Sequence, residues 1–264
     1  MTARGRRNTR QSRASLPAFL RGPGLLAAFL LACLSTPSNA QSAPFGGEVA
    51  LASRLVDRGL AITPETPVLQ GAVSWASPGG WSLGAAGSVE LRSGKPVVGV
   101  ARASRAWAPS ADWLVQAGLL YYDYRAGSGT GFSDRVEANL AFSYRDIATF
   151  GVSAIHPFPG RGQRLLGAAD ANLSWPLTQR LSLIAGAGIA QASVRPRYYR
   201  PGYRNRGRGY ARTQLYGYGN LGLGWAGGPW SLRLERHASS LDAGRVYYGT
   251  GDPPGWVATV SRSF

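Results

Sequence analysis

His237 and Ser239 have the residue types and the spacing of a nucleophilic catalytic pair. Two residues apart on a β-strand, their side chains share one face, so the imidazole could accept the proton of the serine hydroxyl. Asp242 follows on the adjoining segment and could orient the His237 ring. Such a site would hydrolyse an acyl ester. The alternative is that His237 is a solvated side chain beside a loop, with no catalytic role.

A second candidate site is the basic segment 195–212, in which arginine and tyrosine are interleaved and no acidic residue occurs. Its arginines are Arg195, Arg197, Arg200, Arg204, Arg206, Arg208 and Arg212. Guanidinium groups bind phosphate in a bidentate manner, so on an exported protein the lipopolysaccharide phosphates are candidate ligands. The alternatives are a plain solvated loop and, least favoured, a nucleic-acid site that uses charge and stacking.

The charge of the chain is a local feature. The sequence has 29 Lys and Arg against 13 Asp and Glu, and six of the basic residues but none of the acids lie in residues 1–40, which leaves +10 for the remainder. Seven of the remaining basic residues belong to segment 195–212, and without them the net charge is near +3. A general nucleic-acid-binding surface would spread its charge more widely.

Signals for metals and cofactors are missing from the sequence. The histidines are His156 and His237, the one cysteine is Cys33, and no glycine-rich loop joins a strand to a helix. We therefore expect no metal site and no cofactor.

Residues 1–40 have the three-part layout of a secretory signal peptide. Six arginines precede the apolar run 25–34, and Ser38-Asn39-Ala40 stands before Gln41. The run is too short to span a bilayer as a helix, which needs about 20 residues. Leu30-Leu31-Ala32-Cys33 weakly resembles a lipoprotein cleavage box, so lipidation at Cys33 remains an alternative to ordinary cleavage. Either route predicts export and excludes residues 1–40 from the fold.

From residue 46 onward the sequence alternates between apolar and polar residues in pieces bounded by Gly, Pro, Asp or Ser. The predicted strands are 47–59, 67–76, 80–91, 95–107, 112–125, 132–145, 147–157, 163–175, 179–194, 211–226, 229–239 and 254–264. An even number of strands with short turns at one end is typical of bacterial outer-membrane barrels. We predict one domain, residues 41–264, folded as an antiparallel up-and-down transmembrane β-barrel of about 12 strands in the bacterial outer membrane. A soluble periplasmic β-protein is the alternative.

The aromatic residues separate by strand end. Tryptophans flank the short turns, as do Trp81 and Trp107, and only Trp256 lies near the other end. Nearly all tyrosines lie toward the long connections, with Tyr144 as the exception. Two aromatic girdles at opposite membrane interfaces would explain this separation. Cross-strand aromatic pairing alone is the simpler alternative, but it does not account for the segregation of Trp from Tyr.

Strand parity predicts an inner face on which acids and bases are interleaved. The predicted lumen charges are Glu48, Arg54, Arg58, Glu90, Arg92, Glu137, Asp170, Arg233 and Glu235. Arg58 could pair with an acid such as Glu48, Glu90 or Glu137, which we favour over a role in a substrate eyelet because an unpaired charge in a narrow lumen is costly. Strand 95–107 is ambiguous, since either parity turns Arg102 or Arg105 toward lipid unless one lies at the interface.

The last segment, 254–264, is predicted to close the barrel against residues 47–59. It ends on Phe264, and an aromatic residue there resembles the sorting signal that outer-membrane barrels present to the barrel-assembly machinery. Arg262 is expected at the periplasmic interface. Deletion of Phe264 should impair insertion and leave export intact.

Residues 47–84 resemble the Gcw_chp family, proteobacterial proteins of undefined function. The resemblance is carried by Val49-Ala50-Leu51-Ala52-Ser53, Arg58-Gly59, the loop Thr63–Pro67, Leu69-Gln70-Gly71 and Trp81-Ser82-Leu83-Gly84, together with Val260-Ser261-Arg262-Ser263-Phe264. The pattern departs from the family at Leu55 and Asp57, where aromatic residues are usual, and at Ala72. The resemblance implies an outer-membrane barrel and no particular activity.

The His237-Ala-Ser239 spacing is similar to the His-x-Ser-Asn element of outer-membrane phospholipase A and lipid A deacylase enzymes. Ser240 replaces the Asn of that element. Parity also turns His237 and Ser239 inward, whereas those enzymes act from the lipid-facing side. We therefore expect a non-enzymatic protein, either a small pore or a structural surface protein with a charged lumen and a basic outer loop that contacts lipopolysaccharide. A serine-type lipid hydrolase remains the alternative.

Overall fold

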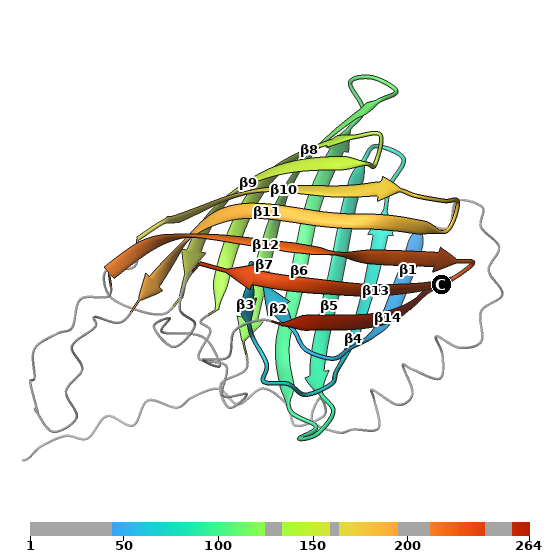
Figure 1. The fold of residues 1–264 in the computed structure, drawn as a ribbon. Coiled ribbons are helices and arrows are strands. Elements are labelled where there is room, and N and C mark those ends of the chain that lie inside the picture. Colours follow the sequence, from blue (N-terminus) through green and yellow to red (C-terminus); the bar gives the residue numbers. More distant parts are fainter. Residues whose placement is uncertain (1–43, 125–133, 159–163, 195–211, 241–254) are drawn as a thin grey trace, which may run out of the picture. The chain divides into compact units, whose positions relative to one another are not determined.

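The computed structural model describes residues 44–124, 134–158, 164–194, 212–240 and 255–264. Twelve antiparallel strands form a closed barrel, and a separate pair, β2 and β3, forms a small sheet (Figure 1). The strands are β1 (Phe45–Ala52), β2 (Val56–Asp57), β3 (Leu60–Ala61), β4 (Val68–Ala76), β5 (Trp81–Glu90), β6 (Pro96–Trp107), β7 (Trp113–Tyr124), β8 (Arg135–Tyr144), β9 (Ala148–Pro157), β10 (Leu166–Pro176), β11 (Leu181–Val194), β12 (Arg212–Gly227), β13 (Trp230–Ser239) and β14 (Trp256–Ser263). None of the described segments is a helix long and apolar enough to cross a membrane.

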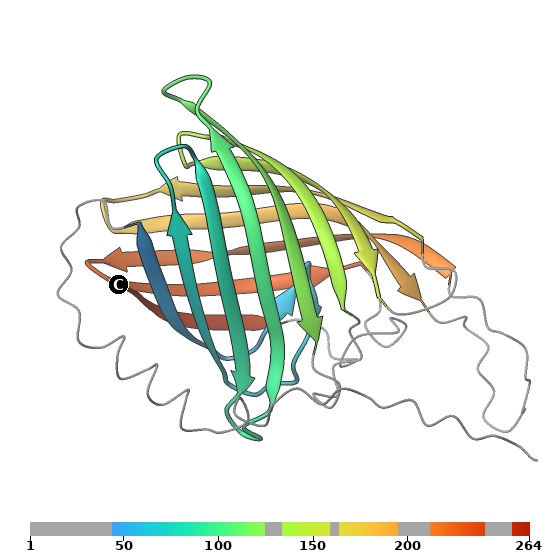
Figure 2. The same cartoon turned by 180° about the vertical axis from the view of Figure 1, so that it is seen from behind.

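Each barrel strand pairs with its neighbour in sequence, and β1 pairs with β14 to complete the ring (Figure 2). The predicted number of barrel strands and their antiparallel order are confirmed. The connections at one end are short, namely 77–80, 108–112, 145–147, 177–180 and 228–229. This end also carries the start of β1 and the end of β14. In outer-membrane barrels the short turns face the periplasm, which orients the molecule.

The first predicted strand was too long. Alternation suggested 47–59, but β1 ends at Ala52, where its ladders to Val68 of β4 and Thr259 of β14 both stop. Residues 53–67 then form a connection that contains β2 and β3. Arg54 and Arg58 consequently lie on this connection and not on a barrel strand.

Along each barrel strand, alternate residues face the outer surface and the lumen, as the sequence predicted. The outer surface carries a band of exposed apolar side chains, including Leu83, Leu119, Leu140, Phe142, Phe150, Val152, Ile189, Leu221, Leu223, Leu232 and Leu234. In water this band would be unfavourable, whereas hydrocarbon solvates it. Trp81, Trp107, Trp113, Trp175, Trp225 and Trp230 are also exposed, at the end with the short turns. The tryptophan girdle predicted for that end is therefore present.

The tyrosines only partly follow the predicted girdle. Tyr121 is exposed on the outer surface. Tyr122, Tyr124, Tyr216 and Tyr218 lie on the opposite strand parity and belong to the buried clusters inside the barrel or pack against them. These rings contact the connection between β1 and β4, so most tyrosines that the structure describes near the outer end stabilise the lumen instead of a lipid interface.

The closing strand is held by Phe264 as well as by its ladder. Gly47 and Phe264 exchange two backbone hydrogen bonds, each with an N–O distance of 3.0 Å. The phenyl ring lies over Gly47, and a Cβ placed on Gly47 would stand 2.3 Å from two ring carbons. An aromatic ring that covers a glycine on the neighbouring strand is a known stabilising pair in sheets.

Substituting Gly47 by Val should displace the Phe264 ring and weaken the β1–β14 closure by roughly 1 kcal/mol, the scale of a cross-strand pair. Phe264→Ala should have a similar effect. Urea unfolding of the refolded barrel, followed by heat-modifiable gel mobility, measures the change. Gly71→Val on β4 is the matched control, because no atom lies within 4 Å of its added Cβ. Equal losses for Gly47→Val and Gly71→Val would contradict this account of closure.

Candidate functional site

The connection 53–67, here called the lumen hairpin, folds into the barrel instead of extending outward (Figure 1). Asp57 pairs with Leu60, so Arg58 and Gly59 form a two-residue turn. Both have positive φ, 46° for Arg58 and 72° for Gly59, as this type of tight turn requires. A Cβ on Gly59 would stand 2.6 Å from Cβ of Tyr218 and 2.8 Å from the Ala238 carbonyl oxygen. The tip of the hairpin therefore touches the inner wall at β12 and β13.

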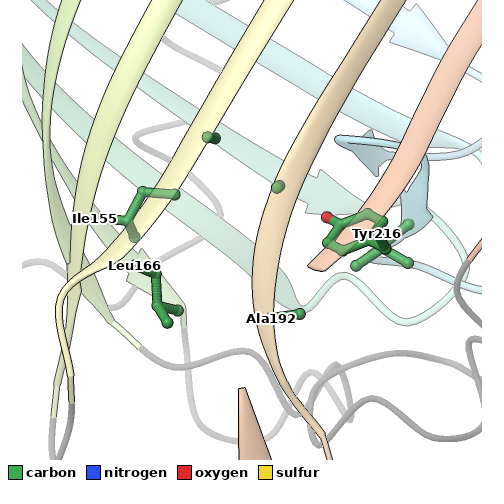
Figure 3. Close-up of a cluster of buried hydrophobic side chains, with 7 residues drawn as sticks. Ile155, Leu166, Ala192 and Tyr216 are labelled. Atoms are coloured by element: carbon green, nitrogen blue, oxygen red, sulfur yellow. The ribbon is translucent and has the colours of Figure 1, made fainter. Parts of the chain in front are cut away.

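Apolar packing holds one side of the hairpin. Leu60 is buried in a cluster with residues of β9 to β12, of which Ile155, Leu166, Ala192 and Tyr216 are labelled in Figure 3. These wall residues are spread over about sixty positions of sequence. They meet because β9 to β12 are consecutive neighbours in the sheet, in which Leu166 pairs with Ile155 and Ala190 pairs with Tyr216. Removing a buried Leu side chain from such a cluster costs about 2–5 kcal/mol in soluble proteins, so the contact is a substantial anchor.

The other side of the hairpin packs against β6 and β7. Ile62 is buried with Val97 and Tyr124, and Leu55 packs on the same cluster. Leu55 and Thr63 are joined by a hydrogen bond from the Leu55 amide to Thr63 Oγ1 at 3.0 Å, and the Ile62 amide donates to the Leu55 carbonyl at 2.8 Å. The hairpin thus contacts the wall on both flanks and spans the bore.

Charged side chains join the tip of the lumen hairpin to β8. The Arg58 guanidinium donates to both carboxylate oxygens of Glu137 on β8, with Nη1 3.1 Å from Oε2. Arg135, also on β8, donates from Nη2 to Oδ2 of Asp57 at 2.7 Å, and its Nε lies 3.7 Å from Oε2 of Glu137. Two cations and two anions therefore alternate, and the group is neutral. Pairing of this kind offsets the cost of removing charges from water.

Aromatic rings cover this charge cluster. The carbon at the centre of the Arg135 guanidinium lies 4.1 Å from the ring centroid of Tyr122 and 5.7 Å from that of Tyr124. The two rings are stacked, with an interplanar angle of 9°. Cation–π contacts in such partly desolvated places contribute about 1–2 kcal/mol each. The tyrosines consequently fix the position of Arg135, which in turn holds Asp57.

The Asp57 carboxyl has a perturbed acidity. Burial alone would raise its pKa, but the charges of Arg135 and Arg58 outweigh burial and lower the pKa below its ordinary value of 3.8. Because the pKa is lower in the folded state, Asp57 stabilises the hairpin at neutral pH. That contribution is lost only as the pH falls below 3.8 and through the folded-state pKa. At neutral pH Asp57 therefore contributes fully to the attachment of the hairpin to β8.

Below the hairpin the bore remains open. One cavity of about 270 Å³ lies directly under it and is lined by Leu55, Asp57 and Tyr122 among others. A second cavity, about 520 Å³, extends toward the periplasmic end and is lined by Arg102, Ser74 and Ser263. Glu48 and Tyr122 line both, so the two cavities adjoin. Within the described part of the chain, Glu48 and Arg102 have no ion pair and remain available to a solute.

The predicted partner of Arg58 is confirmed, since Glu137 was one of the three acids proposed for it. Arg54 is buried and pairs with the exposed Glu65 within the hairpin connection. Glu90 accepts hydrogen bonds from Thr66 and Ser93. Arg92 lies in the exposed turn after β5, not on the inner wall, because β5 ends at Glu90. Arg54 and Glu90, two of the predicted lumen charges, therefore contact residues of the lumen hairpin.

The remaining predicted lumen charges lie on the far wall. Asp170 on β10 accepts a hydrogen bond from Asn172 Nδ2 at 3.0 Å. Glu235 on β13 accepts one from Asn220 Nδ2 at 2.6 Å. Arg233 is on the same parity of β13 as Glu235 and is exposed to the bore. These groups share the inner face as predicted, but the structure joins none of the three to the ion cluster of Arg58 by a hydrogen bond or ion pair in the residues it describes.

The proposed catalytic pair does face inward. His237 stands opposite Asn220, and Ser239 stands opposite Tyr218, beside the hairpin tip. Asp242 lies outside the described residues, as does most of the basic segment 195–212, of which only the backbone of Arg212 is described as the start of β12. Among the described residues no group of three His, Cys, Asp or Glu could hold a metal ion.

Sequence reasoning missed Asp57, Arg135, Tyr122 and Tyr124 as members of this site. One signal for the hairpin was present: the charges at 54, 57 and 58 break the alternation of the predicted strand 47–59. A tight turn centred on Arg58-Gly59 would have accounted for that break.

Porins are among the solved structures similar to this chain. The chain superposes on the KdgM porin with a TM-score of 0.51 at 8% identity, covering 83% of this chain and 99% of that one. For the NanC porin the TM-score is 0.52 at 13% identity, with 83% and 98% covered. A KdgM porin in complex with disordered oligogalacturonate gives 0.50 at 9% identity, with 83% and 98% covered. This chain has the fold of outer-membrane porins. At these identities the likeness is one of fold.

No family model matches the chain, so the resemblance to the Gcw_chp family stays a prediction. No curated protein matches the sequence.

Replacing Glu137 by Ala would leave Arg58 without its partner and give the buried cluster a net positive charge. We expect a loss of about 3 kcal/mol in unfolding free energy, the scale of a broken buried pair. Urea unfolding in detergent micelles measures it. The double variant Arg58→Met with Glu137→Leu removes both charges and should recover most of the loss. A single variant as stable as the unmodified protein would contradict the role of this ion pair.

Proposed function

We propose that this barrel is a narrow pore for small solutes in the outer membrane, with the lumen hairpin as its constriction. The observation that carries the proposal is the attachment of the hairpin across the bore, from the contact of Gly59 with β12 and β13 to the packing of Ile62 against β6 and β7. The likeness to porins supports the proposal at the level of the fold.

The size of the barrel is compatible with this function. Eight-stranded barrels are filled by their own side chains, and barrels of 16 to 18 strands leave an aqueous channel. Twelve strands lie between these cases, so an inserted segment decides whether the bore conducts. Here the hairpin narrows the outer half, and the cavities of the inner half stay accessible from the periplasmic end.

The polar groups of the inner cavity suit small polar solutes. Arg102 and Glu48 supply opposite charges on the wall of the 520 Å³ cavity, and Ser74 and Ser263 supply hydrogen-bonding groups. Gln70 lines the adjoining 270 Å³ cavity. A solute that passed the hairpin would exchange water for these groups at modest cost. The apolar outer belt and the polar bore together favour transport over a purely structural role.

Single-channel recording in planar bilayers tests the pore and its constriction. Ala52 and Val68 are direct cross-strand partners, so replacing 53–67 by Asn-Gly should join β1 to β4 without changing register. This deletion should raise the conductance at least about twofold over the unmodified protein, because it removes material from the bore. Arg58→Gln with Glu137→Gln, which keeps the hairpin and the net charge, should give intermediate or fluctuating conductance.

Two outcomes would overturn the proposal. If the deletion variant shows no channel events at any voltage, the barrel is not a pore. If it conducts like the unmodified protein, the hairpin is not the constriction. Heat-modifiable gel mobility shows that each variant is folded before recording.

We also propose that segment 195–212 contacts lipopolysaccharide at the outer rim. Its support is positional and chemical: it joins β11 to β12, the two longest strands, at the end opposite the short turns, and it carries seven arginines without an acid. Phosphate groups at that surface are suitable partners for guanidinium.

Replacing the seven arginines of this segment by Ser should increase the sensitivity of cells to large hydrophobic antibiotics, because clamped lipopolysaccharide limits their entry. Minimal inhibitory concentrations measure the effect. The matched control replaces Arg92 and Lys95, which lie on another outer turn, by Ser. Unchanged sensitivity at equal expression would refute the contact.

A further inference from the structure

Arg105 has an unusual position for a charged side chain on the membrane-facing surface. It lies near the periplasmic end of β6, and its guanidinium carbon is 5.3 Å from the ring centroid of Trp81 and 5.3 Å from that of Trp107. Both indoles are exposed on the outer surface. Arg102, three residues earlier, faces the bore. The ambiguity of this strand is thereby resolved: Arg102 is the inward arginine and Arg105 the interfacial one.

The charge of Arg105 is not neutralised within the protein. Among the residues that the structure describes, Arg105 has no ion pair and no hydrogen bond to an acid. Asp112, an acid at the same end, is occupied by Arg145 at 2.7 Å. A guanidinium has five N–H donors in its plane, and in the described part of the chain no acid accepts from those of Arg105.

The same combination recurs on the other side of the barrel seam. Arg262 of β14 is the cross-strand partner of Trp230, just as Arg105 is the partner of Trp81. Its guanidinium carbon lies 5.6 Å from the Trp230 ring, and its Nε is buried without a hydrogen-bond partner. In both places a tryptophan directly after a periplasmic turn holds an arginine at the depth of the lipid headgroups.

We propose that Arg105, between Trp81 and Trp107, is a binding site for the phosphodiester of a phospholipid in the periplasmic leaflet, with Arg262 and Trp230 as a second site of the same kind. At this depth the abundant anion is the headgroup phosphate. Arginine binds it through two parallel N–H donors, and the indoles suit the interface. The short turns place both sites on the periplasmic side, which selects phospholipid over lipopolysaccharide. This inference does not depend on the proposed pore.

Native mass spectrometry of the full barrel, released from nanodiscs of phosphatidylcholine with a minor fraction of phosphatidylglycerol, tests the site. Phosphatidylglycerol is the probe. The unmodified protein should retain it severalfold more often than Arg105→Gln. Arg102→Gln is the matched control, because it removes the same charge from the same strand on the lumen side, and it should retain lipid like the unmodified protein. Arg105→Lys keeps the charge without the planar guanidinium and its paired N–H donors, and should show intermediate retention.

The outcomes separate the site from general charge effects. Equal loss of lipid in Arg102→Gln and Arg105→Gln would mean that net charge alone attracts the lipid and would overturn the proposal. Equal retention in all variants would overturn it as well. If heat-modifiable mobility shows that Arg105→Gln does not fold, the comparison of Arg105→Lys with the unmodified protein decides. Full retention in Arg105→Lys would then overturn the bidentate guanidinium site.

Discussion

The need to satisfy every backbone hydrogen bond within hydrocarbon is the constraint on which this structure depends. A bilayer offers no water to unpaired strand edges, so a sheet that spans it must close. Here closure is the pairing of β1 with β14, extended to Gly47 and Phe264. The pairing of β1 with β4 ends at Ala52, and its pairing with β14 ends one residue later, with the hydrogen bond from the Ser53 amide to the Ala258 carbonyl. The residues that follow are then free to fold into the bore.

A second constraint is the free-energy cost of placing charged side chains in a narrow bore, and the lumen hairpin meets it by pairing them. Arg58 and Asp57 enter the bore together and meet an acid and a base that alternate on β8, so the assembled cluster is neutral. An isolated charge there would be expensive, and an apolar tip would leave Arg135 and Glu137 with only their mutual contact at 3.7 Å. The outer half of the bore is consequently held by ion pairs and apolar contacts. In the inner half, Glu48 and Arg102 have no ion pair among the residues that the structure describes.

Strand β6 shows how a period of two assigns different roles to one residue type. Arg102 and Arg105 are three positions apart, so they must face opposite sides. The inward residue meets a polar cavity, and the outward one meets two indoles at headgroup depth. Charge on the lipid face is tolerated near an interface and is costly at the midplane. Strand parity alone does not say which of the two arginines faces lipid. Arg105 can do so because it lies at the depth of the interface, and depth in the membrane is not encoded in the parity.

The sequence by itself determined the barrel, its even number of strands, the end with the short turns and the tryptophan girdle. These follow from a local period of two and from turn residues, which each strand carries in its own sequence. Only the tertiary structure decided that 53–67 turns inward and that tyrosines line the bore. Arg58 and Glu137 are 79 residues apart, and Asp57 and Arg135 are 78 apart. Such contacts exist only after the ring has closed, so no local pattern encodes them.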